Sequence, residues 1–493
     1  MMVFSNTHIH HHSISFKLNH YKVYEQMKNS NSKLDLHVAI FAFPFGTHAA
    51  PLLNITKKLA SNAPTLIFSF FNTSKSNTLI FSSSKKDQVQ GNKHKLGNIR
   101  VYDVWDGVPQ GYVSKGNPEE EIELFMAAAP TALKAAVAEA EAETGRRVSC
   151  MVGDAFLWFV GEMAQEKGVP WVATWPGPQY DLSVHLHTDL IRETIGVQEN
   201  AESRKDQVLD FIPGMSKIRV EDLPQGVVMG NQESFFSQML HQVGRVITHA
   251  TAICINSCEE LNPTITLDLK AKLPPKVLFV GPYNLILPPS STPSLDENNC
   301  LAWLDQQEAN SVAYVSFGSF ARPSPSEIFA LAQGLEASRV KFLWSLKDHL
   351  KVYLPDGFVE NNREKGKIVP WAPQTEVLAH EAVGVFITHF GYNSIIESIP
   401  AQVPMIGRPL IGEQKLNGRF VEAVWGIGVE VESGVFTKDG VVKSLARVLW
   451  DEESIKLKEN IKGLKEVIAK ALGPQGSCNG NFLHLLDIVT NSS

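Results

Sequence analysis

The turn His389-Phe390-Gly391-Tyr392-Asn393-Ser394 has the residue types of an anion site. It follows an apolar, β-branched run from Val383 to Thr388, which is typical of a strand buried in a parallel sheet. It precedes a helical pattern from Ile395 onward, where Ser394 and Glu397 match a capping box. Unpaired N–H groups and the positive end of the helix dipole favour an anion at such a helix start. The sequence therefore predicts a diphosphate site at this turn.

Two residues near the turn offer contacts to the rest of a nucleotide. The indole of Trp371 is a flat surface that can stack on a base, and the carboxylate of Glu397 has two acceptor oxygens suited to ribose hydroxyls. Each also has a structural interpretation, Trp371 as a core residue and Glu397 as the cap of its own helix. Taken singly, the structural interpretations are the commoner ones.

A histidine and an aspartate lie at the ends of two other predicted strands. Leu36 to Phe43 is a buried-strand pattern, and His48 follows it in a loop of the kind where open α/β sheets bind ligands. Val148 to Val152 is a second such pattern and ends in Gly153-Asp154. A lone histidine is more often a packed residue, and an aspartate there is often a turn or a cap. The position of His48 nevertheless favours a general base.

The length, net charge and cysteine count of the chain limit the class of protein. Its 493 residues are too many for one core and predict two domains, each of about 200 residues or more. A net charge of −7 offers no basic footprint for nucleic acid and favours a small-molecule partner. The five cysteines are odd in number and scattered, which argues against a disulfide framework and indicates a reducing compartment, here the cytoplasm.

Composition also suggests the domain boundaries. Residues 1–30 are rich in histidine and lack the apolar core of a signal peptide, so we expect a disordered leader, with metal binding as an alternative and Met27 as an alternative start. We expect a first α/β domain over residues 31–275, a Pro-rich linker over 276–299 and a second α/β domain over 300–475. The apolar runs fall short of the roughly 18 residues that a membrane span requires.

The stretch from Trp371 to Gln414 resembles the signature box of the plant family-1 UDP-sugar glycosyltransferases. Tryptophan opens that box, His-x-Gly-x-Asn-Ser lies at its middle, Glu follows three residues on, and an acid-Gln pair closes it. The strings AFPFGTHAAPLL, FIPGMSK, YVSFGS and GVFTKDG are similar to the flavonoid and anthocyanidin 3-O-glycosyltransferase branch, from about Leu36 to the C terminus. The resemblance implies the GT-B fold, in which two Rossmann-like domains face one cleft, with residues 476–493 as a helix packed back on the first domain.

The same resemblance implies a single displacement with inversion. In the family, the residue matching Asp154 bonds the histidine matching His48, and a carboxylate there fixes the tautomer and stabilises the imidazolium. His48 is expected to deprotonate a flavonoid hydroxyl, which attacks the anomeric carbon while UDP leaves. The helix start at Asn393-Ser394 and His389 are expected to stabilise the leaving diphosphate. No cofactor or metal is expected, since we find no Asp-x-Asp pair that would hold a divalent ion.

A set of site residues follows from the resemblance as well. Those expected at the UDP-sugar are Ser319, Ser345, Trp371, Ala372, Gln374, His389, Gly391, Tyr392, Asn393, Ser394, Glu397, Glu413 and Gln414. Those expected at the acceptor are Glu119, Phe156 and His185. Helix N-capping is the structural alternative for Ser319 and Ser345, and core packing is the alternative for Phe156.

Departures from the family pattern concern the sugar. Tyr392, Phe390 and Glu413 stand where relatives usually have Trp, Cys and Asp. The usual Trp-Thr-Ala-Gly-Pro segment has become Trp175-Pro176-Gly177-Pro178-Gln179, which lacks a threonine that can bond the sugar 6-hydroxyl. An unpaired hydroxyl in a closed site costs about 1–3 kcal/mol, and a donor without a 6-hydroxyl avoids that cost.

Two donors are therefore considered. Gln414 commonly accompanies glucose in relatives, whereas aliphatic Leu410-Ile411 in place of two phenylalanines favours a sugar without a 6-hydroxyl. We predict a monomeric enzyme that transfers a hexose to the 3-hydroxyl of a flavonol or an anthocyanidin, with UDP-glucose as the first donor and UDP-rhamnose as the second. A relative that binds UDP or flavonoids without catalysis is a further alternative. A nicotinamide oxidoreductase is disfavoured, because neither domain has GxGxxG after its first strand.

Overall fold

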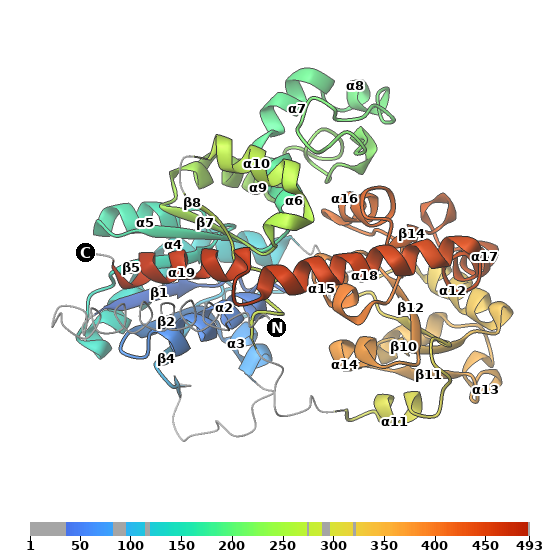
Figure 1. Ribbon diagram of the computed structural model, residues 1–493. Coiled ribbons are helices and arrows are strands. Elements are labelled where there is room, and N and C mark those ends of the chain that lie inside the picture. Colours follow the sequence, from blue (N-terminus) through green and yellow to red (C-terminus); the bar gives the residue numbers. More distant parts are fainter. Residues whose placement is uncertain are drawn as a thin grey trace, which may run out of the picture.

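The computed structural model describes residues 36–81, 95–113, 119–273, 276–287, 296–318 and 322–491. The predicted leader of residues 1–30 and the predicted site residue Ser319 lie outside these ranges. The described chain forms two α/β units, each built on one sheet, that lie side by side (Figure 1). The prediction of two α/β units is therefore confirmed.

The first unit has an eight-stranded sheet in the order β3-β4-β2-β1-β5-β6-β7-β8, which is parallel except at the β3 edge. Its central strand is buried on both faces, because Ala39 and Phe41 belong to one hydrophobic cluster while Val38 and Ile40 belong to another. The strands are β1 (His37–Phe41), β2 (Ile67–Thr73), β3 (Lys95–Leu96), β4 (Ile99–Val104), β5 (Cys150–Asp154), β6 (Trp171–Trp175), β7 (Ala252–Ile255) and β8 (Lys276–Phe279).

Helices cover both faces of this sheet. The apolar residues of α2 join the cluster that contains Val38, and those of α4 join the cluster that contains Phe41. The α-helices of the first unit are α2 (Ala49–Asn62), α3 (Ser74–Phe81), α4 (Glu120–Thr144), α5 (Val160–Lys167), α6 (Gln179–Leu186), α7 (Thr188–Ile195), α8 (Glu199–Glu202), α9 (Phe235–Val246) and α10 (Pro263–Lys272).

The second unit has a six-stranded parallel sheet in the order β11-β10-β9-β12-β13-β14. Its strands are β9 (Val312–Val315), β10 (Lys341–Ser345), β11 (Gly366–Val369), β12 (Val383–Thr388), β13 (Met405–Gly407) and β14 (Gly428–Glu430). Its α-helices are α11 (Cys300–Leu304), α12 (Pro325–Ser338), α13 (Phe358–Asn361), α14 (Gln374–Ala379), α15 (Tyr392–Ala401), α16 (Gln414–Arg419) and α17 (Lys438–Leu449).

Each sheet has one place where the strand order reverses, and these two places position the site. In the first sheet the reversal lies between β1 and β5, and in the second it lies between β9 and β12. Parallel open sheets bind ligands beyond the carboxyl ends of the strands at such a reversal. His48 follows β1, Asp154 ends β5, and His389 follows β12. His48, Asp154 and His389 therefore lie where the topology leaves a crevice.

Strand β8 corrects the predicted linker of residues 276–299. Residues Lys276–Phe279 pair in parallel with β7 and complete the first sheet, so the connection between the units begins only after them. Proline-rich sequence on both sides made this segment resemble a linker, so the short strand was not predicted. Its apolar residues Val277, Leu278 and Phe279 are buried.

Two final helices connect the units again. Helix α18 (Glu452–Leu472) and helix α19 (Ser477–Thr490) run in line across the second and then the first unit (Figure 1). Phe482, Leu485 and Val489 of α19 lie in the same hydrophobic cluster as β1. None of the helices in the described part of the chain combines the length and the apolarity that crossing a bilayer requires.

Candidate active site

His48 and Asp154 form a hydrogen-bonded pair at the crevice of the first sheet. Nδ1 of His48 lies 2.8 Å from Oδ2 of Asp154, and the aspartate is buried. The other carboxylate oxygen accepts from the backbone N–H of Phe156 at 3.0 Å, which fixes the carboxylate plane. With Nδ1 held in this way, Nε2 of His48 is the ring nitrogen left to take a proton.

Aromatic side chains surround the imidazole. The ring of Phe156 lies 4.7 Å from that of His48, and the ring of Phe43 lies 5.0 Å from it. Further rings extend this wall, namely those of Phe45, Phe125, Trp175 and Phe236. An apolar, flat-sided wall beside a base suits an aromatic acceptor. Sequence reasoning named only Phe156 among them, although Phe43 and Phe45 flank Pro44 just before His48.

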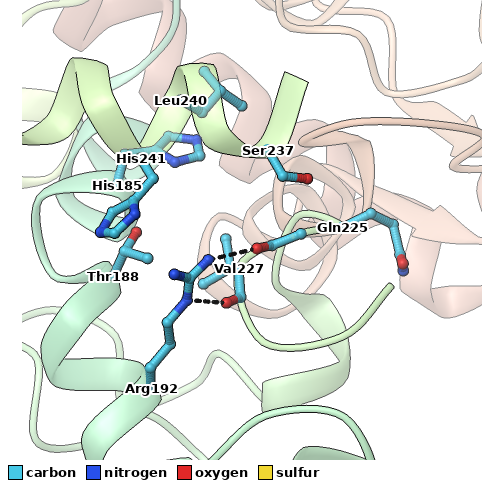
Figure 2. Close-up of a pocket in the computed structure, with 9 residues that line it drawn as sticks. His185, Thr188, Arg192, Gln225, Val227, Ser237, Leu240 and His241 are labelled. Carbon is cyan, nitrogen blue, oxygen red and sulfur yellow. Dashed lines mark hydrogen bonds between the residues drawn. The ribbon is translucent and has the colours of Figure 1, made fainter. Parts of the chain in front are cut away.

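The two other predicted acceptor residues lie on separate helices. Nε2 of His185 on α6 is 3.5 Å from Oδ1 of Asp181, and its ring lies 5.8 Å from that of Trp175. His185 also lines a cavity of about 10 Å³ between α6, α7 and α9, which has room for about one water molecule (Figure 2). Glu119 directly precedes α4 and accepts from the N–H of Glu123 through its backbone carbonyl at 2.9 Å.

The predicted diphosphate turn is present, but its helix begins earlier than expected. Helix α15 starts at Tyr392 with Gly391 as its N-cap, so Ser394 is inside the helix and the predicted capping box is wrong. Ser394 and Glu397 instead accept from the side-chain amide of Gln374, at 3.2 and 2.8 Å. The free N–H groups of the helix start are therefore those of residues 392–394, and they remain suited to an anion.

His389 lies beside this helix start, and its imidazole is uncharged. Its ring fills the space left by Gly318 and Gly391, where an added Cβ atom would come within 3.0 and 2.5 Å of the ring. Burial lowers the pKa of His389 to about 4, so the imidazole is neutral near pH 7. It can therefore act on a phosphate as a hydrogen-bond donor rather than as a fixed cation.

The residues predicted for the base and ribose cluster beyond β11 and on α15. Trp371 is 52% exposed, which contradicts a core role and leaves its indole free to stack, and the adjacent Ala372 is buried. Both oxygens of Glu397 have partners, Gln374 at 2.8 Å and Asn284 at 3.3 Å. Burial raises the pKa of Glu397 above its ordinary value. Ser345 ends β10 at the same edge of the sheet.

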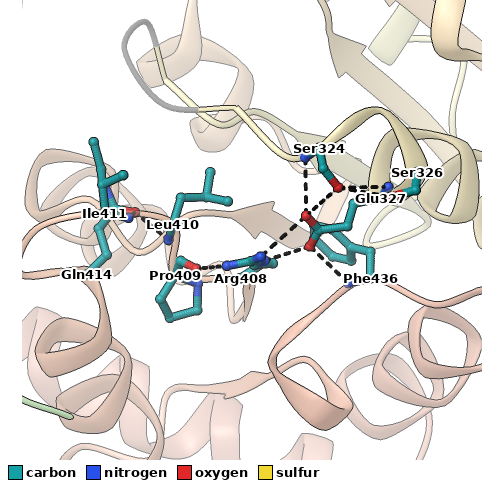
Figure 3. A network of polar contacts seen from close by, with 9 residues as sticks. All are labelled: Ser324, Ser326, Glu327, Arg408, Pro409, Leu410, Ile411, Gln414 and Phe436. Atoms are coloured by element: carbon teal, nitrogen blue, oxygen red, sulfur yellow. Dashed lines mark hydrogen bonds and ion pairs between the residues drawn. The ribbon is translucent and has the colours of Figure 1, made fainter. Parts of the chain in front are cut away.

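The predicted sugar contacts lie at the start of α16. Oε1 of Gln414 accepts from the N–H groups of Leu410 and Ile411 at 2.8 and 3.1 Å (Figure 3). Its amide oxygen is therefore occupied by its own loop, and its N–H₂ is the group left for a ligand. Burial, with the neighbouring carboxylate of Asp181, raises the pKa of Glu413 to about 7.

An ion pair fixes the loop that carries these contacts. Nε of Arg408 donates to Oε1 of Glu327 at 2.7 Å, and the guanidinium also bonds the carbonyl of Pro409 (Figure 3). Glu327 caps its own helix through Ser324, so α12 anchors the loop after β13. Sequence reasoning did not find this pair, because the partners are 81 residues apart.

Two of the residues that depart from the family pattern, Tyr392 and Phe390, have side chains that pack inside the protein. The hydroxyl of Tyr392 donates to the carbonyl of Asn256 in the first unit at 2.8 Å, so only the backbone of Tyr392 faces the anion site. The ring of Phe390 is fully buried in space that Gly407 and Gly418 leave open. Contact between Tyr392 and the UDP-sugar stays a prediction, and the hydroxyl of Tyr392 is used at the interface between the units.

Among the described residues, no group of three or more His, Cys, Asp or Glu side chains is arranged to hold a metal ion. The expectation of chemistry without a metal stays a prediction. All five cysteines are buried and free.

Comparisons with known proteins agree with this geometry. Residues 52–469 match the family described as UDP-glucoronosyl and UDP-glucosyl transferase. The chain is 50% identical over 462 residues to the anthocyanidin 3-O-glucosyltransferase UFGT of Vitis vinifera, an alignment that covers 94% of this chain and 99% of that protein. It is 50% identical over 464 residues to the flavonol 3-O-glucosyltransferase of Arabidopsis thaliana, with 94% and 99% covered.

A solved structure shows the same architecture. The crystal structure of a UDP-glucose:anthocyanidin 3-O-glucosyltransferase in complex with UDP matches with a TM-score of 0.85 and 40% identity, over 93% of this chain and 99% of that one. Two Rossmann-like units, with an imidazole in one and a helix start suited to an anion in the other, thus define a transferase of the predicted GT-B fold. The chain belongs to the UDP-glucoronosyl and UDP-glucosyl transferase family, and it is a UDP-glycosyltransferase.

Proposed function

We propose that this enzyme transfers glucose from UDP-glucose to the 3-hydroxyl of a flavonol or an anthocyanidin, with inversion at the anomeric carbon. The observation that carries this proposal is the His48–Asp154 pair, which lies at 2.8 Å inside a wall of aromatic rings. His48 removes the proton of the 3-hydroxyl, the oxygen attacks the anomeric carbon, and the bond to UDP breaks on the opposite side. Asp154 stabilises the imidazolium that forms.

The second unit, which carries the predicted UDP-sugar residues, supports the same scheme. The N–H groups at the start of α15 and the neutral imidazole of His389 are placed to stabilise charge on the leaving diphosphate. Trp371 offers a platform for uracil, Glu397 accepts from ribose, and Glu413 with Gln414 binds sugar hydroxyls. No metal ion takes part in this scheme.

Glucose is preferred over rhamnose as the transferred sugar. Gln414 presents its N–H₂ to the site, and relatives that are 50% identical over nearly their whole length carry the name glucosyltransferase. Pro176 offers no hydroxyl to the sugar, and its carbonyl is bonded by Asn256 at 2.8 Å. The sequence argument for rhamnose therefore rests on the loss of one contact, and overall similarity favours glucose.

A donor series tests the proposal. Purified protein, treated with EDTA, is incubated with one flavonol and with UDP-glucose, UDP-galactose or UDP-rhamnose in turn. We expect turnover with UDP-glucose to exceed the others, and the product to be a 3-O-β-glucoside by NMR. Turnover of rhamnose without glucose would overturn the donor, and attachment at another hydroxyl would overturn the regiochemistry. Loss of activity on EDTA treatment, restored by a divalent ion, would contradict metal-free transfer.

A further inference from the structure

The side chain of Asn417 joins the two halves of the site. It lies on α16, three residues after Gln414, and is fully buried. Its Nδ2 donates to the carbonyl of Phe390 at 2.9 Å, and its Oδ1 accepts from the hydroxyl of Tyr180 at 2.9 Å. Because a carbonyl only accepts, the amide nitrogen must face Phe390, and the amide oxygen must face Tyr180. The amide orientation is thus fixed by both units together.

Tyr180 belongs to the first unit, which carries His48 and the predicted acceptor residues and is therefore the acceptor half of the molecule. It lies on α6, the helix that also carries His185, and Figure 1 shows α6 beside α16 at the junction of the units. Its ring stacks on that of Phe420 at 3.7 Å with an interplanar angle of 9°, and Trp425 packs edge-on at 5.8 Å. Burial raises the pKa of Tyr180 well above its ordinary value, so the hydroxyl keeps its proton and remains a donor to Asn417.

Phe390 is the point at which Asn417 acts on the diphosphate turn. It has φ of +59°, a left-handed conformation that is uncommon for a residue with a bulky side chain. Its ring is locked beside Gly407 and Gly418, and its carbonyl is held by Asn417. The next residue, Gly391, is the N-cap of α15. The direction of the anion-binding N–H groups therefore depends on the hydrogen bond from Asn417.

Asn417 also reaches the sugar end of the site. Its Nδ2 lies 3.5 Å from Oε1 of Glu413, and its backbone N–H donates to the carbonyl of Glu413 at 2.9 Å. One buried amide therefore contacts the diphosphate turn, a sugar-binding carboxylate and the acceptor half. The hydroxyl of Tyr180 bonds this amide and so links the first unit to both of them.

We propose that Tyr180 and Asn417 are a positioning pair, through which the acceptor half holds the diphosphate turn and the start of α16 in place for the donor. The inference rests on the proposed function, which assigns these two elements to the UDP-sugar. Without the Tyr180 hydroxyl, Oδ1 of Asn417 loses its donor at a fully buried position, and the amide is no longer held in the orientation that supports Phe390. Donor binding weakens as a result.

The test compares two substitutions in the same interface. Tyr180→Phe removes the hydroxyl and keeps the ring stack, whereas Phe420→Leu weakens the stack and keeps the hydrogen bond. We expect Tyr180→Phe to raise the Kd of UDP and the KM of UDP-glucose about tenfold, the effect of one unpaired buried acceptor. Its kcat at saturating donor should stay within about twofold of the wild type. Phe420→Leu should lower the Tm while leaving the Kd of UDP unchanged.

A double substitution provides the second measurement. Asn417→Ala should weaken UDP binding at least as much as Tyr180→Phe, and combining the two should add little, because both break one link. Full additivity, or a Tyr180→Phe variant that binds UDP as tightly as the wild type, would overturn the positioning pair. A wild-type protein that does not bind UDP would instead contradict the proposed function. If Tyr180→Phe does not fold, the Kd of UDP is compared between Asn417→Ala and Phe420→Leu instead. Weaker binding by Asn417→Ala alone supports the positioning pair, and equal binding by the two variants overturns it.

Discussion

The side-chain amide of Asn393 donates to the hydroxyl of Thr47 at 2.7 Å, and these two residues belong to different halves of the molecule. Asn393 is the second residue of α15, and Thr47 directly precedes His48. The candidate base and the diphosphate turn therefore face each other across the junction of the units. Holding two substrates at attack distance in such a site lowers the activation free energy by on the order of 7 kcal/mol or more.

Removing the base is expected to slow chemistry without loosening the nucleotide. His48→Ala should lower kcat by ~10² to 10⁴, the usual worth of positioned general-base help, while the Kd of UDP stays the same. Asp154→Asn should give a loss in the same direction, because the imidazolium loses its counter-charge. His380→Ala is the matched control, since His380 also pairs with an aspartate, Asp305 at 3.1 Å, but is not a candidate site residue. Single-turnover product formation by His48→Ala at the wild-type rate would disprove the assignment.

Trp371 should carry much of the affinity for the base. Stacking of a base on an aromatic side chain is worth about 1–3 kcal/mol when measured by alanine substitution, so Trp371→Ala should raise the Kd of UDP by about 5- to 150-fold. Trp450→Ala is the control, because Trp450 is a 64% exposed tryptophan at the end of α17 in the same unit and is not a candidate site residue. Calorimetry with UDP measures both variants. Equal affinities for the two variants would refute stacking at Trp371.

Two carboxyl groups should give the enzyme a pH-dependent stability. Burial with Asp181 raises the pKa of Glu413 to about 7, and burial with Glu422 raises that of Glu430 to about 7. The ordinary value is 4.5, so the folded protein holds each proton more tightly than the unfolded chain, and stability falls as pH rises from 4.5 to about 7. Glu413→Gln and Glu430→Gln should each flatten this fall in Tm.

Only one of these carboxyl groups is expected to affect the donor. In the proposed function the ionised form of Glu413 accepts hydrogen bonds from sugar hydroxyls, so the KM of UDP-glucose should decrease as pH rises through 7, and Glu413→Gln should remove that dependence. Glu430→Gln should keep it. The profile of KM against pH, measured between pH 6 and 8 for all three proteins, checks the assignment. An unchanged profile in Glu413→Gln would exclude Glu413 from the sugar site.

Binding of UDP should draw a proton onto His389. Burial lowers its pKa to about 4, and a diphosphate beside the ring raises that pKa, so the complex binds more protons than the free enzyme in the range just above pH 4. Affinity for UDP should therefore rise as pH falls towards 5. Calorimetry in two buffers of different ionisation enthalpy measures the proton uptake. His389→Gln supplies the reference for titration of the nucleotide itself, and equal uptake by both proteins would argue against the contact.

Local sequence patterns were sufficient for the strands that carry the site. β12 spans Val383–Thr388, as predicted, and β1 (His37–Phe41) lies within the predicted pattern of Leu36 to Phe43, because a short apolar run between polar turn residues has few other stable arrangements in a layered α/β protein. The start of α15 was predicted three residues late. Ser394 and Glu397 fit a capping box in sequence, but Gln374 of another helix takes both as hydrogen-bond acceptors.

The sequence by itself determined the kinds of chemistry available: an imidazole and a carboxylate at the ends of two strands, and a turn suited to an anion after a third. The tertiary structure alone decided which side chains face the ligand and which hold the units together. Tyr392 turns to Asn256, and Tyr180 meets Asn417 from 237 residues away. Strand and helix periodicity reports only neighbours a few residues apart, whereas a buried polar group finds its partner wherever packing brings one within reach.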